Sequence, residues 1–267
     1  MKPLGLIAGK GELPALIVRE ARAQGRKVVA IALEPVTDSV PGADVLERVH
    51  IGKLGSVIKA LKAHGVHEAV MAGKISKTLL YGKKIRPDLR AAALLFRLKD
   101  RGDDSIINAV AKEFEKDGIR LIGIPEICPK LLTPEGTLTR HKPTDKEWKD
   151  IEFGFRIAKE IGRLDIGQVV VIKDRAVMAV EAIEGTDEAI RRGSNLAGGG
   201  VTVVKVIRPT QDARFDMPVV GLDTLSAMID SGARVLCLEA HKSIFLDREE
   251  FISRANSAHI SVVGYKD

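Results

Sequence analysis

Aromatic residues, cysteines and long apolar runs are all scarce in this chain of 267 residues. Only 4% of the residues are aromatic, which argues against a single-stranded nucleic-acid platform, because such platforms stack bases on aromatic rings. The two cysteines, Cys128 and Cys237, lie far apart without metal-ligand spacing, which predicts buried thiols in a reducing compartment. No apolar stretch approaches the roughly 20 residues that cross a bilayer. Because strand-like sequence starts close to Met1, we expect a cytoplasmic protein without a leader.

The motifs of several enzyme classes are also missing. There is no G-x-S-x-G elbow, no H-E-x-x-H pair and no P-loop, and the six histidines form no close ligand pair. What remains is a chain that is 45% hydrophobic and 29% charged, as in globular proteins. Its net charge of +6 and isoelectric point near 9.3 indicate an anionic partner, such as a phosphorylated small molecule or anionic lipid.

Apolar runs alternate with amphipathic stretches in the first half of the chain. The predicted strands are residues 4–9, 27–33, 68–73 and 119–124. The predicted helices between them are residues 13–25, 56–65 and 103–118. Gly25 and Gly118 are expected to end two of these helices in the left-handed conformation. Near-continuous apolar strands separated by helices favour a parallel, Rossmann-like sheet covered on both faces.

The second half contains a different α/β pattern. Residues 128–147, with three prolines and four threonines, are predicted to be a linker, and Asp145 is expected to cap the helix that follows. Residues 167–183 predict a hairpin that turns at 173–175, so this sheet should be mixed. We therefore expect two α/β domains, residues 1–132 with a parallel sheet and residues 133–267 with a mixed sheet.

The turn after the first strand, "AGKGELP", is a candidate phosphate-binding site. Gly9 and Gly11 bring backbone N–H groups close to a helix start, where an anion is stabilised. Pro14 replaces the third glycine of a dinucleotide fingerprint, whereas Glu34 lies where a ribose-binding acid is found. A nicotinamide cofactor and a plain turn therefore both stay open.

A second glycine turn and a basic stretch follow the third strand of the first half. Gly73 and Lys74 come directly after that strand, so both turns should meet at one edge of the sheet. Between Lys74 and Arg101 there are nine basic residues against two acidic ones. This stretch is either a solvated helix face or a surface for phosphate or anionic lipid. Asp103 and Asp104 either cap a helix or bind a ribose.

The densest polar sequence is "KVIRPTQDARFDMPVVGLDT", residues 205–224. Asp216 lies between Phe215 and Met217, where a carboxylate needs a partner or a metal. Mg²⁺ on one or two carboxylates and substrate phosphates fits this pattern, and an Asp–Arg pair that fixes a loop is the alternative. Glu181, inside an apolar strand, is either a second metal ligand or the partner of a buried arginine.

Several stretches together resemble the LpxI family of UDP-2,3-diacylglucosamine pyrophosphatases, which act in lipid A synthesis. They are "LGLIAGKGELP", "AGKIS", "GDDSII", "EIGRLDIGQVVV", "AVEAIEGTDEAIRRG" and "QDARFDMPVVGLDT". Lys74 departs from the small polar residue expected in the second of these. The resemblance implies a UDP-binding N-terminal domain, a catalytic C-terminal domain and an active site in the cleft between them. It also implies Mg²⁺, with UMP and 2,3-diacylglucosamine 1-phosphate as products.

The resemblance and the residue patterns together define the predicted site. Asp216 matches the acid on which the family depends most, and Gly9 and Gly11 match its nucleotide-side glycines. The predicted catalytic residues are Lys205, Gln211, Arg214 and Asp216, with Asp216 and Glu181 as metal ligands. The predicted binding residues are Gly9, Gly11, Glu12, Gly73, Lys74, Asp103, Asp104, Arg208 and Thr224.

The predicted partners are a UDP-linked diacyl sugar lipid and the surface of the inner membrane, with peripheral contact and no nucleic acid. The oligomeric state is left open, a homodimer included. Two other functions stay open as well: a nicotinamide-dependent oxidoreductase and a non-catalytic nucleotide-binding protein.

Overall fold

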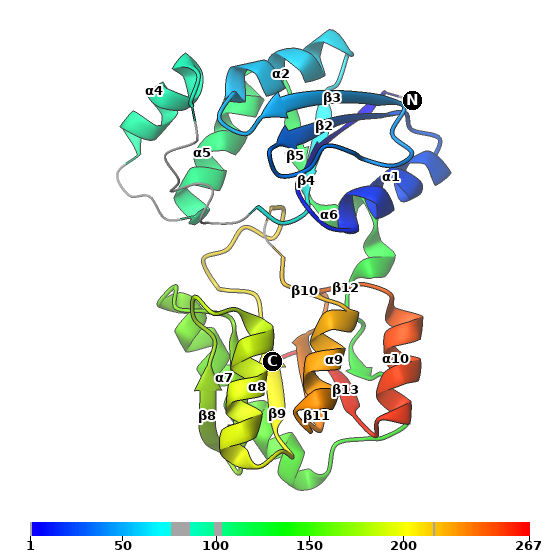
Figure 1. Ribbon diagram of the computed structural model, residues 1–267, viewed down its shortest axis with the longest axis vertical. Helices are drawn as coiled ribbons and strands as arrows, with labels where there is room; N and C mark the ends of the chain where they lie inside the picture. The colour runs from blue at the N-terminus through cyan, green and yellow to red at the C-terminus, as the bar shows by residue number, and fades with distance from the viewer. Residues whose placement is uncertain (1, 76–85, 99–102, 216) are drawn as a thin grey trace. The chain divides into compact units, whose positions relative to one another are not determined.

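The chain forms two units, Met1–Pro129 and Lys130–Asp267, and each is built on one large sheet. The computed structural model describes residues 2–75, 86–98, 103–215 and 217–267, with backbone alone at 103–105 (Figure 1). Both predicted α/β domains are confirmed, as are the parallel sheet of the first and the mixed sheet of the second. The predicted boundary between residues 132 and 133 lies close to the division between the units.

The N-terminal unit has a parallel five-stranded sheet in the order β3-β2-β1-β4-β5. Its strands are β1 (Leu4–Ala8), β2 (Val28–Glu34), β3 (Val45–His50), β4 (Glu68–Ala72) and β5 (Arg120–Ile122). Its helices are α1 (Leu13–Ala23), α2 (Leu54–Ala63), α4 (Leu89–Arg97), α5 (Asp103–Lys116) and α6 (Ile124–Ile127). All residues of β1 are buried, as expected for a central parallel strand. Gly25 and Gly118 have φ of 73° and 77°, which confirms the two predicted helix ends.

The C-terminal unit is built on a six-stranded mixed sheet in the order β6-β13-β11-β9-β7-β8. Its strands are β6 (Gly136–Thr137), β7 (Val169–Lys173), β8 (Ala176–Val180), β9 (Thr202–Lys205), β11 (Val235–Glu239) and β13 (Ser261–Tyr265). β10 (Val219–Val220) and β12 (Ile244–Phe245) form a separate parallel pair. Its helices are α7 (Asp145–Arg163), α8 (Thr186–Ala197), α9 (Leu222–Asp230) and α10 (Arg248–Ser257), and a 3₁₀ turn, η1 (Pro129–Leu131), spans the division between the units.

The two faces of this mixed sheet carry different helices (Figure 1). Val170 and Ile172 pack with α7, whereas their neighbours Val169 and Val171 pack on the opposite side, in the core that also contains Phe251 of α10. The alternation follows from the period of two in a strand. The predicted hairpin is confirmed, since β7 and β8 pair antiparallel across Asp174 and Arg175, both with positive φ.

Two predictions about the start of this unit differ from the structure. The predicted linker, residues 128–147, is not free, because β6 pairs with β13 and Thr133 is buried, where its hydroxyl donates to Ser243 O at 3.2 Å. Asp145 does not cap α7 but is its first residue. The cap is Thr144, whose hydroxyl accepts from Glu147 N while the Glu147 carboxylate accepts from Thr144 N at 2.8 Å. This capping box satisfies two N–H groups at once, which Asp145 alone cannot do.

Both cysteines are buried and neither is in a disulfide bond, and each unit contains one of them. Burial raises the pKa of the Cys237 thiol far above its usual range. None of the helices in the described part of the chain is long and apolar enough to cross a membrane.

Candidate active site

Two glycine turns touch at the centre of the N-terminal sheet, where the strand order changes direction between β1 and β4. Gly9 N donates to Ala72 O at 2.8 Å, and Lys10 and Lys74 exchange two backbone hydrogen bonds of 2.9 and 2.8 Å. A Cβ on Gly9 would lie 2.8 Å from Lys74 O, and one on Gly73 would lie 2.7 Å from the carbonyl carbon of Gly9. Both glycines are therefore needed because two backbones approach closely at the edge where ligands of such sheets bind.

Lys10 and Lys74 are directly paired on this antiparallel bridge, and both are exposed. Like charges placed directly opposite each other on neighbouring strands repel and destabilise the pairing. An anionic ligand near both ammonium groups reverses the sign of this interaction. Lys10 therefore joins the predicted residue Lys74 as a candidate contact for a phosphate or another anion.

The start of α1 lies directly after this bridge. Gly11 has φ of 108° with nothing within 4 Å of an added Cβ, and Glu12, at the N-cap position, makes no side-chain cap. Pro14 occupies the first turn, and no acidic side chain of that turn compensates the helix dipole. An anion at this end of the helix would meet N–H groups that no side chain caps.

Replacing Gly9 with Ala should destabilise the N-terminal unit by about 2–3 kcal/mol, because the methyl group would overlap the backbone of the second turn. Chemical denaturation followed by circular dichroism measures this loss. Gly65→Ala is the matched control, since Gly65 has φ of 69° but no atom within 4 Å of the added Cβ. It should lower the free energy of unfolding by only about 1 kcal/mol, because alanine is disfavoured in the left-handed backbone conformation. Equal losses in the two variants would contradict the close-approach argument.

In the C-terminal unit a buried chain of polar groups joins Glu181, Thr186 and Lys205. Glu181 Oε2 accepts from Gln168 N at 3.1 Å, and Glu181 Oε1 accepts from the Thr186 hydroxyl at 2.8 Å. Lys205 Nζ donates to Thr186 Oγ1 at 3.2 Å and to Val219 O at 2.9 Å. Glu181 and Lys205 are 7% and 5% exposed, so this chain explains how both charges are tolerated inside the domain.

Two helix starts lie beside this chain. α8 begins after Gly185 and α9 after Gly221, and neither glycine can supply a side-chain cap. α8 and α9 pack against each other, and the Thr224 hydroxyl donates to Asp187 Oδ1 at 3.1 Å. The predicted residues Lys205, Glu181 and Thr224 are thus brought to the starts of α8 and α9.

The loop after β9 is fixed at its base by an ion pair between the buried Glu239 and the half-buried Lys159. Glu239, at the end of β11, accepts from Lys159 Nζ at 2.5 Å and from Ile207 N at 3.1 Å. Lys159 Nζ also donates to Ile207 O at 3.0 Å. Both backbone groups of Ile207 are therefore bound by side chains from other elements. The loop that carries residues 208–218 starts from this anchor.

Four predicted residues lie in this loop, and the structure describes three of them, Arg208, Gln211 and Arg214. Arg208 forms an ion pair with Asp165, and Arg208 N donates to Gln211 Oε1 at 3.2 Å. Arg214 holds the Asp212 carboxylate at 2.7 Å, which keeps the pKa of Asp212 below its usual value. Asp216 lies outside the described residues, as do the side chains of Asp103 and Asp104, whose backbone begins α5.

The structure adds residues that sequence reasoning missed. Lys10, Thr186, Lys159, Asp165 and Glu239 all contact a predicted residue or its loop. Only Glu239 carried a signal in the sequence, as an acid at the end of the apolar run "RVLCLE". The others follow from pairings between distant elements.

Few side chains in the described ranges are available as ligands for the predicted metal ion. Within the described ranges no group of three or more His, Cys, Asp or Glu side chains is placed to hold a metal ion. Both oxygens of Glu181 already accept hydrogen bonds. A Mg²⁺ ion held largely by substrate phosphates and water needs only one or two carboxylates, a number that the two predicted ligands, Glu181 and Asp216, would supply.

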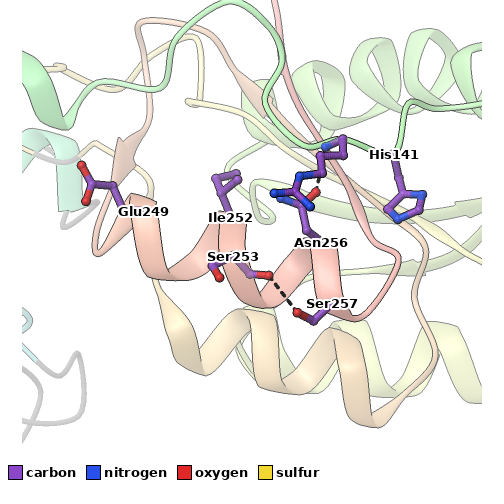
Figure 2. A pocket seen from close by; sticks show the side chains of 7 residues that line it. His141, Glu249, Ile252, Ser253, Asn256 and Ser257 are labelled. Carbon is purple, nitrogen blue, oxygen red and sulfur yellow. Dashed lines mark hydrogen bonds between the residues drawn. The ribbon is translucent and has the colours of Figure 1, made fainter.

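A surface hollow of about 440 Å³ lies elsewhere in the C-terminal unit (Figure 2). Arg140, Asn256 and Ser257 contribute to it, and Arg140 N donates to Asn256 Oδ1 at 2.7 Å. None of the predicted site residues lines this hollow. It is therefore separate from the polar chain around Lys205.

These features define a two-domain α/β protein with candidate sites for phosphorylated ligands. One domain has a parallel sheet with paired glycine turns, and the other has a mixed sheet with a buried lysine at two helix starts. Residues 3–131 match the family model of the LpxI N-terminal domain, and residues 134–263 match that of the LpxI C-terminal domain. The chain belongs to the LpxI family.

Among curated proteins, the chain is 35% identical over 280 aligned positions to the UDP-2,3-diacylglucosamine pyrophosphatase LpxI of Caulobacter vibrioides, covering 99% of this chain and 98% of that protein. Among solved structures, the biotin carboxylase domain of Hydrogenobacter thermophilus 2-oxoglutarate carboxylase is 18% identical with a TM-score of 0.27, over 74% of this chain and 41% of that one. The N5-carboxyaminoimidazole ribonucleotide synthetase of Thermotoga maritima is 20% identical with a TM-score of 0.25, over 68% and 41%. The chain spans less than half of those two proteins, and likenesses this weak carry no argument.

Proposed function

We propose that this protein hydrolyses the pyrophosphate bond of UDP-2,3-diacylglucosamine in lipid A synthesis, releasing UMP and 2,3-diacylglucosamine 1-phosphate. The observation that carries the proposal is the 35% identity to a pyrophosphatase of that name over 99% of the chain. One water molecule is added across the P–O–P bond, so each product keeps one phosphate. Such a reaction depends on charge neutralisation and on an oriented water more than on a protein nucleophile.

The N-terminal unit would hold the nucleotide at its paired glycine turns. Gly11 leaves open space for a ligand to approach the backbone, Gly9 and Gly73 let the two turns meet, and the lysine bridge supplies two positive charges. Glu12, Asp103 and Asp104 remain proposed nucleotide contacts. The geometry that supports this assignment is the like-charge pair of Lys10 and Lys74, which a bound anion would make more favourable.

The C-terminal unit would supply the chemistry. Asp216 is the proposed acid that activates water, and Lys205, Arg208 and Arg214 would neutralise charge that develops on phosphoryl oxygens. Gln211 and Thr224 are proposed contacts to the phosphates. Lys205 is the best supported of these, because it is buried beside two helix starts that also favour negative charge.

We also propose a requirement for Mg²⁺, which when bound would neutralise the two substrate phosphates. Asp216 is the proposed protein ligand. Glu181, the second ligand predicted from the sequence, also has a positioning role through Thr186 to Lys205. A small number of carboxylates is typical of Mg²⁺ bound with phosphates.

The proposed location is the cytoplasm, in peripheral contact with the inner membrane, because the substrate is a diacyl lipid. Nine basic residues among residues 74–101 support contact with an anionic surface. No nucleic-acid partner is proposed.

The purified protein should convert UDP-2,3-diacylglucosamine in detergent micelles to equal amounts of UMP and the lipid 1-phosphate. Chelation of divalent ions with EDTA should stop the reaction, and added Mg²⁺ should restore it. Chromatography of the nucleotides measures the result. Substrate that stays intact with Mg²⁺ present would contradict the proposal, and enhanced NADH fluorescence would favour the oxidoreductase alternative instead.

A further inference from the structure

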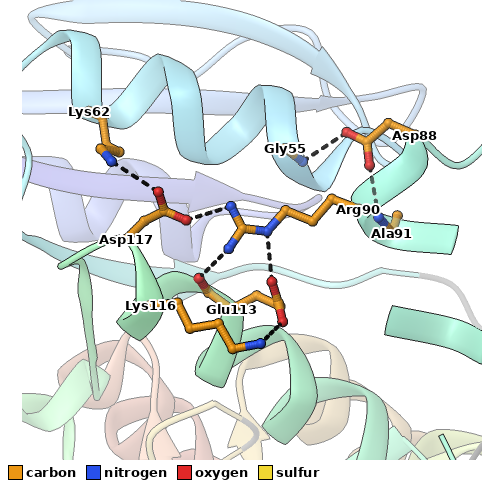
Figure 3. A network of polar contacts seen from close by, with 8 residues as sticks. All are labelled: Gly55, Lys62, Asp88, Arg90, Ala91, Glu113, Lys116 and Asp117. Carbon is orange, nitrogen blue, oxygen red and sulfur yellow. Dashed lines mark hydrogen bonds and ion pairs between the residues drawn. The ribbon is translucent and has the colours of Figure 1, made fainter. Parts of the chain in front are cut away.

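Helix α4 turns Arg90 toward the protein (Figure 3). Arg90 Nε lies 2.7 Å from Glu113 Oε2, Arg90 Nη1 lies 2.5 Å from Asp117 Oδ2, and Arg90 Nη2 donates to Glu113 O at 2.9 Å. Asp88 caps the helix by accepting from Ala91 N at 2.8 Å and also accepts from Gly55 N at 2.8 Å. Polar contacts to α2 and α5 thus fix α4, and Leu94 is its single buried residue.

The opposite side of α4 is an apolar stripe that faces solvent. The stripe consists of Leu89, Ala92, Ala93 and Phe96, which share one helix face by their spacing of three, four and seven residues. Leu89 is 92% and Phe96 is 91% exposed. At the same spacing in α2, residues 54, 57, 58 and 61 are all buried and face the core. The apolar face of α4 therefore points to solvent, whereas the apolar face of a normal surface helix points to the core.

Positive charge borders the stripe. Arg86, three residues before Leu89, and Arg97, the last residue of α4, are both exposed. Asp88 is the one acid among residues 86–98, and both of its oxygens accept backbone hydrogen bonds. A second copy of this chain would bring like charges together at the stripe, whereas an anionic bilayer offers opposite charge and an apolar interior. An apolar helix face with basic flanks is the pattern of a helix that lies in a membrane interface.

We propose that the stripe of Leu89, Ala92, Ala93 and Phe96 inserts into the interface of an anionic bilayer and holds the N-terminal unit at the lipid surface. The choice of a bilayer as partner rests on the proposed function, because a diacyl substrate is presented there. Arg86 and Arg97 would contact the phosphates of the headgroups while the four apolar side chains reach the acyl boundary.

The test is co-sedimentation of the full chain, without substrate, with phosphatidylglycerol–phosphatidylethanolamine vesicles and with neutral phosphatidylcholine vesicles. The double variant Leu89→Ser/Phe96→Ser should partition about tenfold more weakly than wild type into the anionic vesicles. The matched control is Ile183→Ser/Leu196→Ser, which removes two side chains that are 90% and 70% exposed in the C-terminal unit. It should bind like wild type. Thermal melting should be unchanged in both variants, since none of these side chains is buried.

A fluorescent variant reports insertion directly. Trp148 is the single native tryptophan, so the difference between Phe96→Trp and wild type isolates an indole on the stripe. Its emission should shift to the blue with anionic vesicles only, and the shift should weaken when salt rises from about 50 mM to about 500 mM.

Three outcomes would overturn the proposal: equal vesicle binding by wild type and the Leu89→Ser/Phe96→Ser variant, no vesicle binding by wild type, or a wild-type dimer that this variant dissociates. The proposed function is tested separately by UMP release in detergent. Vesicle binding without UMP release would support this inference and contradict the proposed function. UMP release without vesicle binding would support the proposed function and contradict this inference.

Discussion

Replacing Asp216 with Asn should lower the rate of UMP release about a thousandfold, while UDP binding stays within a few-fold of wild type. The substitution keeps the size of the side chain and removes its capacity to accept a proton from water. Initial rates of UMP release and calorimetric titration with UDP measure the two quantities.

The described part of the loop supports this choice of residue. The chain leaves the mixed sheet at Lys205 and enters the separate β10–β12 pair at Val219, whose carbonyl oxygen accepts from Lys205 Nζ at 2.9 Å. The ion pair of Glu239 and Lys159 fixes the first turn through Ile207. A loop pinned at both ends is the kind of rigid support that a catalytic side chain requires.

Asp212→Asn is the matched control for this experiment, because Asp212 lies in the same loop and its carboxylate is bound by Arg214. It should slow UMP release less than tenfold. Similar losses in both variants would mean that general loop damage, and not loss of one acid, accounts for the effect. A nearly normal rate with Asp216→Asn would remove this residue from the mechanism.

Replacing Glu239 with Ala should destabilise the C-terminal unit by about 3 kcal/mol. The Glu239 side chain is 6% exposed and bonds Lys159 at 2.5 Å and Lys242 at 3.1 Å. Its removal leaves Lys159, whose side chain is 25% exposed, without the carboxylate and leaves Ile207 N without an acceptor. Chemical denaturation measures the loss, and UMP release should fall as well because the loop anchor is gone.

The control for this second prediction is Glu160→Ala, on the neighbouring position of α7. Glu160 pairs with Arg163, and both side chains are 61% exposed, so the loss should be about 0.5 kcal/mol or less. Glu239→Gln should fall between the two, since the amide oxygen still accepts from Ile207 N. Equal stability of Glu239→Ala and wild type would show that the anchor contributes nothing to the fold.

The sequence predicted those elements whose signal is local. β1 and β2 are continuous apolar runs, and both were found from the pattern alone, as was the β7–β8 hairpin from its turn. β3 was missed because its residues alternate between intermediate and exposed, which gives an edge strand little apolar signal. β6 was missed because its pairing with β13 joins residues far apart in sequence, and its proline-rich surroundings resembled a linker.

In the candidate site, too, residues with a local signal were predicted and contacts between distant elements were not. Gly9 and Gly73 were predicted from turns that follow apolar strands, and the structure adds that they contact each other. The polar chain of Glu181, Thr186 and Lys205 was predictable only in part, because the hydroxyl that joins the two charges lies on another element. The apolar face of α4 could not be oriented from the sequence, since its spacing equals that of the buried face of α2.

The rate at which each buried cysteine reacts with a thiol reagent would report how often the core of its unit opens. Cys128 and Cys237 are 1% and 0% exposed, so a thiol reagent reaches each one only when the surrounding core opens. Mass spectrometry of the labelled peptides would follow both rates in one sample, because one cysteine belongs to each unit. A ligand that closes the N-terminal unit alone would slow labelling of Cys128 and leave that of Cys237 unchanged, which would show where the ligand binds without a structure of the complex.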